Sequence, residues 1–337
     1  MCTDVRFVRL EQLHVSARTL DFAFELGSQV QVVPRGQTWS ATTTDAGPVL
    51  TWTNSLGFVA LDGFGMSDFF ADGLNEAGLS VATLWLPETS LPAVPAAGDD
   101  PAVDFVNLAG WLLGTCRTVE DVKAALAAVR IWNAPVRALW PSGRPVPPQA
   151  EPLLDAVFTE HLSVHDAHGG DLVVEFLDGR MQVHDNSVGV LTNSPTYPWH
   201  VTNLRNYLGL TTAEDQPYNL MGMPVTPTGN GTGLRGLPGD VTPPSRFVRA
   251  TVLSQAVEGS MDARAAVNQA FHSLDLVSVP RRLAASGDYT QWYVVRDHDA
   301  PALYTRSYDG WTTDCHDLAA LGVAAEGPRR ALPLPAG

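Results

Sequence analysis

The chain has 337 residues, of which 45% are hydrophobic and 17% charged, and its formal net charge is −15. So acidic a protein is not expected to bind nucleic acid or an anionic membrane, since those partners attract basic patches. No apolar run is long enough to span a bilayer, and no basic segment followed by an apolar one opens the chain. We therefore expect a cytoplasmic protein.

The first third of the chain is predicted to form strands. Its segments are rich in β-branched and aromatic residues and are bounded by residues that favour turns. They are residues 29–34, 49–54 and 57–64, followed by a strand–turn–strand unit at residues 71–88. A loop rich in Pro, Gly and Asp follows at residues 91–101.

Two helical patterns come next, over residues 102–116 and 118–130. The second opens with Thr118, and the acidic residues Glu120 and Asp121 follow it. Negative side chains in a first turn interact favourably with the helix dipole. This spacing predicts a helix that begins at Thr118.

The second half of the chain repeats the order of strands and then helices. Residues 158–193 alternate between apolar and polar positions around two turn signals, which indicates strands. Residues 196–245 are rich in Pro, Gly, Asn and Thr and are predicted to be irregular. Helical patterns return at residues 245–257 and 262–277, and residues 289–311 are predicted to form a hairpin.

Strands, two helices, strands, two helices and strands are typical of an α+β fold with segregated layers. No internal repeat and no domain boundary are visible, so we interpret residues 1–337 as a single domain. The short Pro-rich tail at the C-terminus is expected to be loose.

The histidines suggest a metal site, because His161, His165 and His168 are close in sequence. On a helix, His161 and His165 would share a face and could bind zinc. The segment alternates as a strand does, however, and at about 3.3 Å per residue the two side chains would lie roughly 13 Å apart. We expect no metal and no other cofactor.

The cysteines do not form an evident disulfide framework, because there are only three of them. Cys116 lies in an apolar run and is interpreted as a packed thiol. Cys315 precedes His316, but neighbouring residues on a strand point to opposite faces. A catalytic pair is therefore not predicted there.

Cys2 follows the initiator methionine directly. Its small side chain leaves Met1 accessible to removal, so we expect the mature chain to begin at Cys2. One residue would then carry both a thiol and a free α-amine, that is, a nucleophile and its own base. The alternative interpretation is a frayed chain end without a role.

Several short motifs recur together and in order along the chain. They are "MCT" at the start, "ARTLDF" at 17–22, "NEAGLSVA" at 75–82, "LTNSP" at 191–195 and "GLPGD…SRFVRA" at 236–250. In this combination the chain resembles the choloylglycine hydrolase family, which includes bile salt hydrolases and penicillin V acylases. The resemblance implies an N-terminal nucleophile amidohydrolase with a four-layer αββα sandwich, in agreement with the α+β layers inferred above.

The resemblance also implies roles for three residues near the N-terminus. Cys2 matches the family nucleophile, whose thiol attacks an amide carbonyl. Arg18 matches the arginine beside that thiol, where a fixed positive charge favours the thiolate. Asp21 matches the carboxylate that orients the terminal amine.

Three further positions match family residues of the active site. Asn193 matches an asparagine whose side-chain amide helps to form an oxyanion hole. Arg246 matches a second active-site arginine. Trp85 falls where the family donates a backbone N–H to the oxyanion, and here the commoner bile salt hydrolase pattern has an asparagine. A tryptophan resembles the penicillin V acylases of Gram-negative bacteria, some of which also cleave N-acyl homoserine lactones.

The resemblance predicts a small-molecule amide substrate with a hydrophobic acyl group, which would lie near Phe24, Phe64 and Trp85. Bile-salt conjugates, penicillin V and N-acyl homoserine lactones all remain candidate substrates. A homotetramer is also implied, with contacts from the irregular residues 196–245. The alternative from another class is a non-catalytic small-molecule-binding protein on the same fold.

Overall fold

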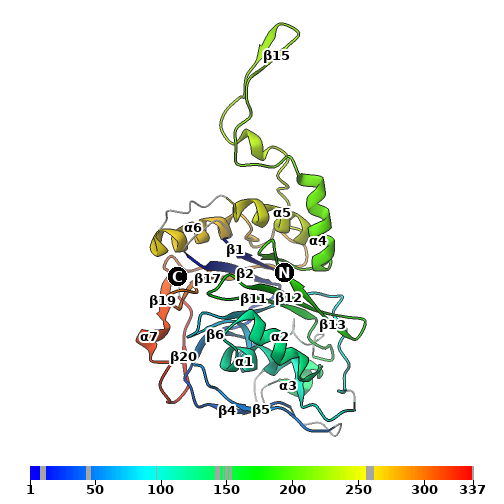
Figure 1. Cartoon of the computed structure of the whole chain (residues 1–337), viewed down its shortest axis with the longest axis vertical. Coiled ribbons are helices and arrows are strands. Elements are labelled where there is room, and N and C mark those ends of the chain that lie inside the picture. Colours follow the sequence, from blue (N-terminus) through cyan, green and yellow to red (C-terminus); the bar gives the residue numbers. More distant parts are fainter. Residues whose placement is uncertain are drawn as a thin grey trace.

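A computed structural model describes residues 1–7, 13–42, 47–95, 97–140, 145–146, 148, 151, 154–255 and 262–335. Two antiparallel β-sheets pack face to face, and helices cover the outer face of each sheet (Figure 1). The chain therefore forms the predicted four-layer αββα sandwich of the α+β class.

The first sheet carries the N-terminus in its interior. Within the described residues it has six strands, in the spatial order β14 (Val190–Leu191), β1 (Cys2–Arg6), β2 (Val15–Phe22), β17 (Tyr289–Asp297), β18 (Ala302–Ser307) and β19 (Asp314–Asp317). β1 lies between β2 and β14: Cys2 to Arg6 pair with β2, and Asp4 and Val5 also pair with β14. A frayed N-terminus is thereby excluded.

The second sheet contains most of the strands predicted from the sequence. Its eight strands among the described residues are β13 (Arg180–Asp185), β12 (Asp171–Leu177), β11 (Glu160–His165), β8 (Ser80–Trp85), β7 (Met66–Asn75), β6 (Phe58–Gly63), β3 (Val30–Val33) and β20 (Arg330–Leu332), in spatial order. β20 comes from the Pro-rich tail. The tail differs here from the loose end expected, because three of its residues pair with β3 at the sheet edge.

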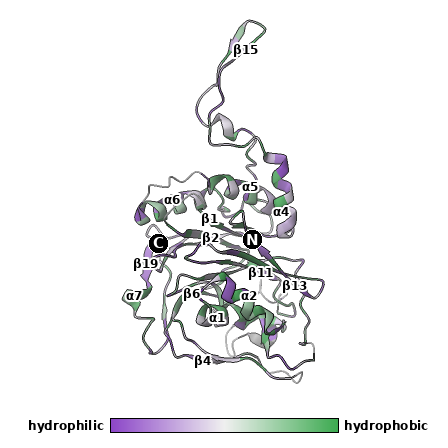
Figure 2. Ribbon diagram, viewed as in Figure 1, coloured by the Kyte–Doolittle hydropathy of each residue, from purple (hydrophilic) through white to green (hydrophobic). Residues whose placement is uncertain are grey.

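Helices cover the outer faces as their sequence patterns predict. α1 (Phe105–Thr115) and α2 (Val119–Ala127) cover the eight-stranded sheet, and α5 (Pro243–Leu253) and α6 (Ala263–Asp275) cover the six-stranded one (Figure 1). α2 begins with a capping box, in which Thr118 and Asp121 satisfy each other's backbone N–H groups. Figure 2 shows hydrophobic residues concentrated in α1 and the central strands.

Smaller elements complete the described chain. The two-stranded pairs are β4 (Thr38–Ser40) with β5 (Thr51–Thr53), β9 (Ala102–Asp104) with β10 (Arg130–Trp132), and β15 (Tyr218–Leu220) with β16 (Met223–Val225). The short helices are α3 (Val136–Leu139), α4 (Tyr197–Asn203) and α7 (Leu318–Leu321), with single 3-10 turns at Leu204–Tyr207 and Thr232–Leu234. None of the helices in the described ranges has both the length and the apolar character needed to cross a membrane.

The region 196–245, predicted to be irregular, contains an arm that leaves the body of the protein. We use the term arm for residues 208–238, and the β15–β16 hairpin forms its tip (Figure 1). Met221 and Gly222 have positive φ angles of 50° and 92° between the paired residues Leu220 and Met223. Two such residues form the hairpin turn that matches the natural strand twist.

Charged side chains from both sheets meet in the buried layer between them. Arg296 of β17 donates to Asp72 of β7 (2.8 Å, Nε–Oδ1) and to Asp4 of β1 (2.9 Å, Nη1–Oδ1). Asp4 also binds His165 of β11 (2.8 Å, Oδ2–Nε2), and Asp72 lies 3.2 Å from Arg18. A buried pair of this kind loses about 3–5 kcal/mol when one partner is removed, so the network fixes how the sheets face each other.

His165 gives the network a measurable dependence on pH. Its ring lies between Asp4 and Asp171, with Nδ1 2.6 Å from Oδ1 of Asp171. Burial alone would lower the pKa of His165, but the two carboxylates raise it to about 9. The native state therefore retains a proton that the unfolded chain releases near its ordinary pKa of 6.5.

We predict that stability is lost at alkaline pH through His165. The contribution of His165 to the free energy of unfolding is on the order of 3 kcal/mol. It is complete below pH 6.5 and disappears as the pH rises through about 9. Urea unfolding at pH 6.5 and pH 9.5 measures it. His165→Gln should show a smaller loss of unfolding free energy over this interval, whereas His272→Gln, exposed on α6, should keep the wild-type loss. Equal losses in all three proteins would contradict the prediction.

Candidate active site

The thiol of Cys2 is held at the start of β1 by pairing with β2. Cys2 lies opposite Leu20 of β2, and its side chain is only 5% exposed. Its Sγ atom is 3.4 Å from Nη2 of Arg18, which is also on β2. The buried guanidinium group therefore donates a hydrogen bond to the sulfur.

Arg18 crosses from the first sheet to the second at a point where two strands separate. β7 and β8 pair from Leu74↔Ser80 to Asp72↔Ala82 and then diverge. The guanidinium group binds the next carbonyl oxygen on each strand, those of Ala71 and Thr83. Burial alone would lower the pKa of Arg18, but Cys2 and Asp72 beside it raise the value. Arg18 therefore stays charged.

Asn193 connects three parts of the site through its side-chain amide. Its Oδ1 accepts hydrogen bonds from the backbone N–H of Cys2 (2.7 Å) and from Nη2 of Arg246 (2.8 Å). Its Nδ2 donates one hydrogen to the carbonyl oxygen of Trp85 (2.7 Å). Because an amide nitrogen carries two hydrogens, one hydrogen of Nδ2 is not used by the Trp85 carbonyl.

Arg246 supports Cys2 from the helix layer. It is fully buried on α5, and its Nη1 donates to the backbone oxygen of Cys2 and to Oγ1 of Thr3, both at 2.5 Å. Pro243 opens the helix with a preset φ angle, which directs the first turn toward β1. Burial lowers the pKa of Arg246, and Asp21 nearby partly offsets that effect.

Asp21 lies at the end of β2, and one of its two carboxylate oxygens lacks a hydrogen-bond partner among the described residues. Oδ1 accepts a hydrogen bond from Oγ1 of Thr290 (2.5 Å), whereas buried Oδ2 has no hydrogen-bond partner among the described residues. The α-amine of Met1 donates to the backbone oxygen of Asp21 (2.5 Å). Burial raises the pKa of Asp21, and Arg246 at 3.8 Å opposes that shift.

Trp85 presents its backbone and its side chain in different directions. The N–H of Leu86 donates to the carbonyl of Thr159, the residue before β11, so the backbone groups of Trp85 face the other edge of β8. That edge is where the Trp85 carbonyl receives its hydrogen bond from Asn193. The indole binds Oγ1 of Thr159 (2.9 Å) and is 41% exposed.

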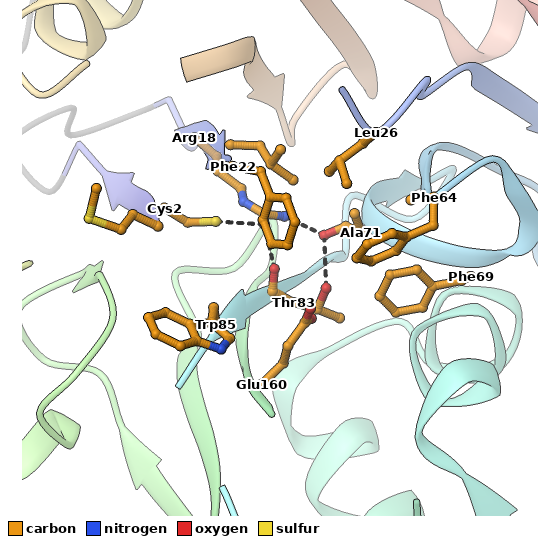
Figure 3. Close-up of a pocket in the computed structure, with 13 residues that line it drawn as sticks. Cys2, Arg18, Phe22, Leu26, Phe64, Phe69, Ala71, Thr83, Trp85 and Glu160 are labelled. Carbon is orange, nitrogen blue, oxygen red and sulfur yellow. Dashed lines mark hydrogen bonds between the residues drawn. The ribbon is translucent and has the colours of Figure 1, made fainter. Parts of the chain in front are cut away.

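A cavity opens beside the thiol. Figure 3 shows Cys2 and Arg18 on one side of this cavity, and its lining is mainly apolar. The apolar lining residues are Met1, Leu20, Phe22, Leu26, Phe64, Phe69, Ala71 and Trp85. This lining suits a hydrophobic group of a ligand.

Two of the three residues expected to contact an acyl group line this cavity, namely Phe64 and Trp85. Phe24 does not line it. Its ring packs instead against Phe22 and Phe64, at centroid distances of 4.9 and 6.1 Å. Phe24 therefore supports the cavity wall from behind these two rings.

Sequence reasoning missed Phe22, Leu26, Phe69 and Glu160 as lining residues. The three apolar residues carry no local signal, because they reach the cavity only through the pairing of distant strands. Glu160 does carry one, since an acidic residue interrupts an otherwise apolar face of alternating positions that includes Leu162 and Val164.

The histidines expected not to bind a metal have separate polar contacts. His161 binds the carbonyl oxygen of Thr192 (3.1 Å) and Glu175 (3.3 Å), whereas His165 binds the aspartates described above. Across the ranges that the structure describes, no group of three or more His, Cys, Asp and Glu residues could hold a metal ion. Cys116 is buried, and burial raises the pKa of its thiol to about 11.

Comparison with known proteins places this geometry in context. The family model for linear amide C–N hydrolases of the choloylglycine hydrolase family matches residues 2–324. A bile salt hydrolase/transferase of Clostridium perfringens is 30% identical over 94% of this chain and 92% of its own length. A penicillin V acylase of Pectobacterium atrosepticum is 28% identical over 60% of this chain and 51% of its own length.

Solved structures show the same similarity. A mutant of the conjugated bile acid hydrolase from Clostridium perfringens has a TM-score of 0.82 and 28% identity, covering 98% of this chain and 96% of that one. Penicillin V acylase from Agrobacterium tumefaciens has a TM-score of 0.78 and 26% identity, covering 99% of this chain and 92% of that one. The chain therefore belongs to the choloylglycine hydrolase family of linear amide C–N hydrolases.

Proposed function

We propose that this chain hydrolyses a linear amide between a hydrophobic acyl group and an amine, with Cys2 as the nucleophile. The observation that carries the proposal is the position of the Cys2 thiol, 3.4 Å from the Arg18 guanidinium and at the wall of an apolar cavity. Membership of a hydrolase family favours this enzyme over a non-catalytic binding protein on the same fold.

Removal of Met1 would prepare the site in two ways. It converts the backbone N–H of Cys2 into a free α-amine, whose ordinary pKa of about 7.7–8.0 suits a base at neutral pH. It also enlarges the cavity, because Met1 is one of the lining residues. Oδ2 of Asp21, which lacks a hydrogen-bond partner among the described residues, is available to accept a hydrogen bond from the new amine and hold it beside the thiol.

In the first step, the α-amine of Cys2 takes the thiol proton and Sγ attacks the amide carbonyl carbon. Negative charge then develops on the carbonyl oxygen. We assign the second hydrogen of Asn193 Nδ2, whose first binds the Trp85 carbonyl, and the backbone N–H of Trp85 to that oxyanion. A preorganised donor of this kind lowers the barrier by about 3–4 kcal/mol.

Collapse of the tetrahedral intermediate breaks the C–N bond, and the protonated α-amine gives its proton to the leaving amine. Water then attacks the thioester carbonyl, while the same amine of Cys2 takes a proton from that water. The C–S bond breaks, the acid leaves and the proton returns to the thiolate. Arg18 retains its own proton throughout, since guanidinium groups stay charged in proteins.

The wall of the cavity favours flat aromatic or extended aliphatic acyl groups. Trp85, Phe22 and Phe64 offer ring surfaces that stack on such groups. We therefore prefer an acyl group like that of penicillin V or an N-acyl homoserine lactone over a bile acid. Conjugated bile salts remain the competing substrate class, because relatives of this chain are bile salt hydrolases.

We also propose that the arm, residues 208–238, mediates assembly into a homotetramer. Leu220, Met221 and Met223 are between 47% and 100% exposed at its tip. Apolar side chains gathered on an extension mark a contact surface, because water alone does not favour them there.

A cytoplasmic location remains part of the proposal. Cys2, Cys116 and Cys315 are all free thiols, and Cys315 is exposed. Free exposed thiols suit a reducing compartment.

The first prediction from the proposed function concerns the Cys2 thiol. Cys2→Ala should abolish hydrolysis, and Cys2→Ser should nearly abolish it, because an alcohol is a much weaker nucleophile near neutral pH. Rates for penicillin V, an N-acyl homoserine lactone and glycocholate measure it. Cys116→Ser and Cys315→Ser serve as matched controls and should retain most activity. Hydrolysis by pure Cys2→Ala would refute the assignment.

The second prediction concerns Trp85. Trp85→Ala should weaken aromatic and long aliphatic substrates by about 1–3 kcal/mol in kcat/KM, as packing in an apolar pocket is lost. Trp85→Asn should shift relative preference toward glycocholate. Residual activity is expected in both, since the backbone N–H remains. Unchanged kcat/KM ratios across the three substrates would mean that the indole does not touch the acyl group.

The third prediction concerns the arm. Changing Leu220, Met221 and Met223 together to Ser should lower the mass measured by light scattering to that of a smaller assembly. Leu283→Ser removes a 59% exposed leucine outside the arm and should leave the mass of the wild type unchanged. A triple variant that remains tetrameric, or a monomeric wild type, would count against the proposal.

A further inference from the structure

A carboxyl group lines the cavity beside Cys2 and takes no part in the steps proposed above. It belongs to Glu160, the first residue of β11, and its neighbours in the lining are mainly apolar. Figure 3 shows the Glu160 side chain directed toward Thr83, between Trp85 and the phenylalanines of the cavity. An acid in such surroundings calls for a partner, because burial without hydrogen bonds is unfavourable.

The position of this carboxyl is fixed by strand pairing. Glu160 lies opposite Trp85 across β11 and β8, so both side chains project from the same face of the sheet. The backbone oxygen of Glu160 accepts a hydrogen bond from Oγ1 of Thr89 (2.9 Å), which anchors the strand at this residue. The carboxyl group is therefore held in the cavity wall by its backbone.

One oxygen of this carboxyl has no partner in the protein. Oε2 of Glu160 is buried and accepts no hydrogen bond from the described part of the chain. The nearby Arg18 does not supply one, since its terminal nitrogens bind Cys2, Asp72 and backbone carbonyls. A group on a ligand in the cavity could satisfy this oxygen.

The charge around Glu160 indicates what kind of group that is. Burial raises the pKa of Glu160, while Thr83 and Arg18 partly offset the shift. A carboxyl that is protonated more readily than usual can both donate and accept a hydrogen bond. A ligand ammonium would instead meet the fixed positive charge of Arg18, so a neutral oxygen function fits better.

We propose that Glu160 is a specificity-determining residue, whose carboxyl group hydrogen-bonds a hydroxyl or oxo group on the acyl chain of the substrate. This inference rests on the proposed function, which places the acyl group in the cavity that Glu160 lines. It narrows the acyl half of the substrate to hydrophobic chains that carry an oxygen substituent near the scissile carbonyl.

The test compares substrates that differ only in that substituent. We would measure kcat/KM for N-octanoyl, N-3-hydroxyoctanoyl, N-3-oxooctanoyl and N-3-aminooctanoyl homoserine lactones with wild type, Glu160→Leu and Glu160→Gln. Wild type should prefer the oxygen-bearing chains by roughly 10-fold. Glu160→Leu should reverse the preference by accelerating the plain octanoyl substrate, and Glu160→Gln should keep part of it because an amide still donates and accepts.

Glu88→Gln is the matched control, since Glu88 is exposed, binds Ser194 and does not line the cavity; it should keep the wild-type ratios. Hydrolysis with equal ratios in wild type and Glu160→Leu would overturn the Glu160 proposal and leave the proposed function intact. A wild-type preference for the 3-amino chain would overturn the Glu160 proposal and show that this carboxyl group binds a cation instead. A loss of kcat for every substrate in Glu160→Gln would make Glu160 catalytic, and no hydrolysis of any acyl amide would overturn both proposals.

Discussion

The guanidinium group of Arg18 is held by groups from both sheets, and this buried charge fixes where the nucleophile lies. It belongs to β2 of one sheet, yet it binds carbonyl oxygens of β7 and β8 in the other. Asp72 joins it to Arg296, and Arg296 in turn joins Asp4 on the same strand as Cys2. A charge that is costly to bury is therefore compensated at its terminal nitrogens, one of which also binds the thiol.

Asn193 holds a second group of site residues together through its side-chain amide. It follows β14, which pairs with β1, and its amide receives hydrogen bonds from Cys2 and Arg246 while donating to Trp85. Because each of these contacts orients the amide in the same sense, its second hydrogen has a fixed direction. Preorganisation of this kind requires no rearrangement during the reaction.

Local sequence patterns predicted the layers well, because strand alternation and helix periodicity depend on near neighbours. The helix beginning at Thr118 and the strands around Phe58–Gly63 are examples. The resemblance supplied Cys2, Arg18 and Asn193, but composition and spacing could not have brought them together, since their contact depends on strands that are distant in sequence.

The errors have equally physical causes. β20 was missed because its pairing partner, β3, lies almost the whole chain away, and Pro-rich composition conceals a three-residue edge strand. Phe24 was assigned to the cavity from the resemblance, whereas its ring packs behind that of Phe22, which lines the cavity. Glu160 is recognisable in the sequence as an acidic residue in an apolar pattern, but only the structure places it in the cavity wall.

The most direct test of the account is to trap the covalent intermediate and locate it by mass spectrometry. Enzyme quenched in acid during turnover of penicillin V or an N-acyl homoserine lactone would be digested and its N-terminal peptide analysed. The account predicts a peptide that begins at Cys2, without Met1, and carries the mass of the acyl group on that residue. An acyl group on any other residue, or acylated enzyme that retains Met1, would contradict it.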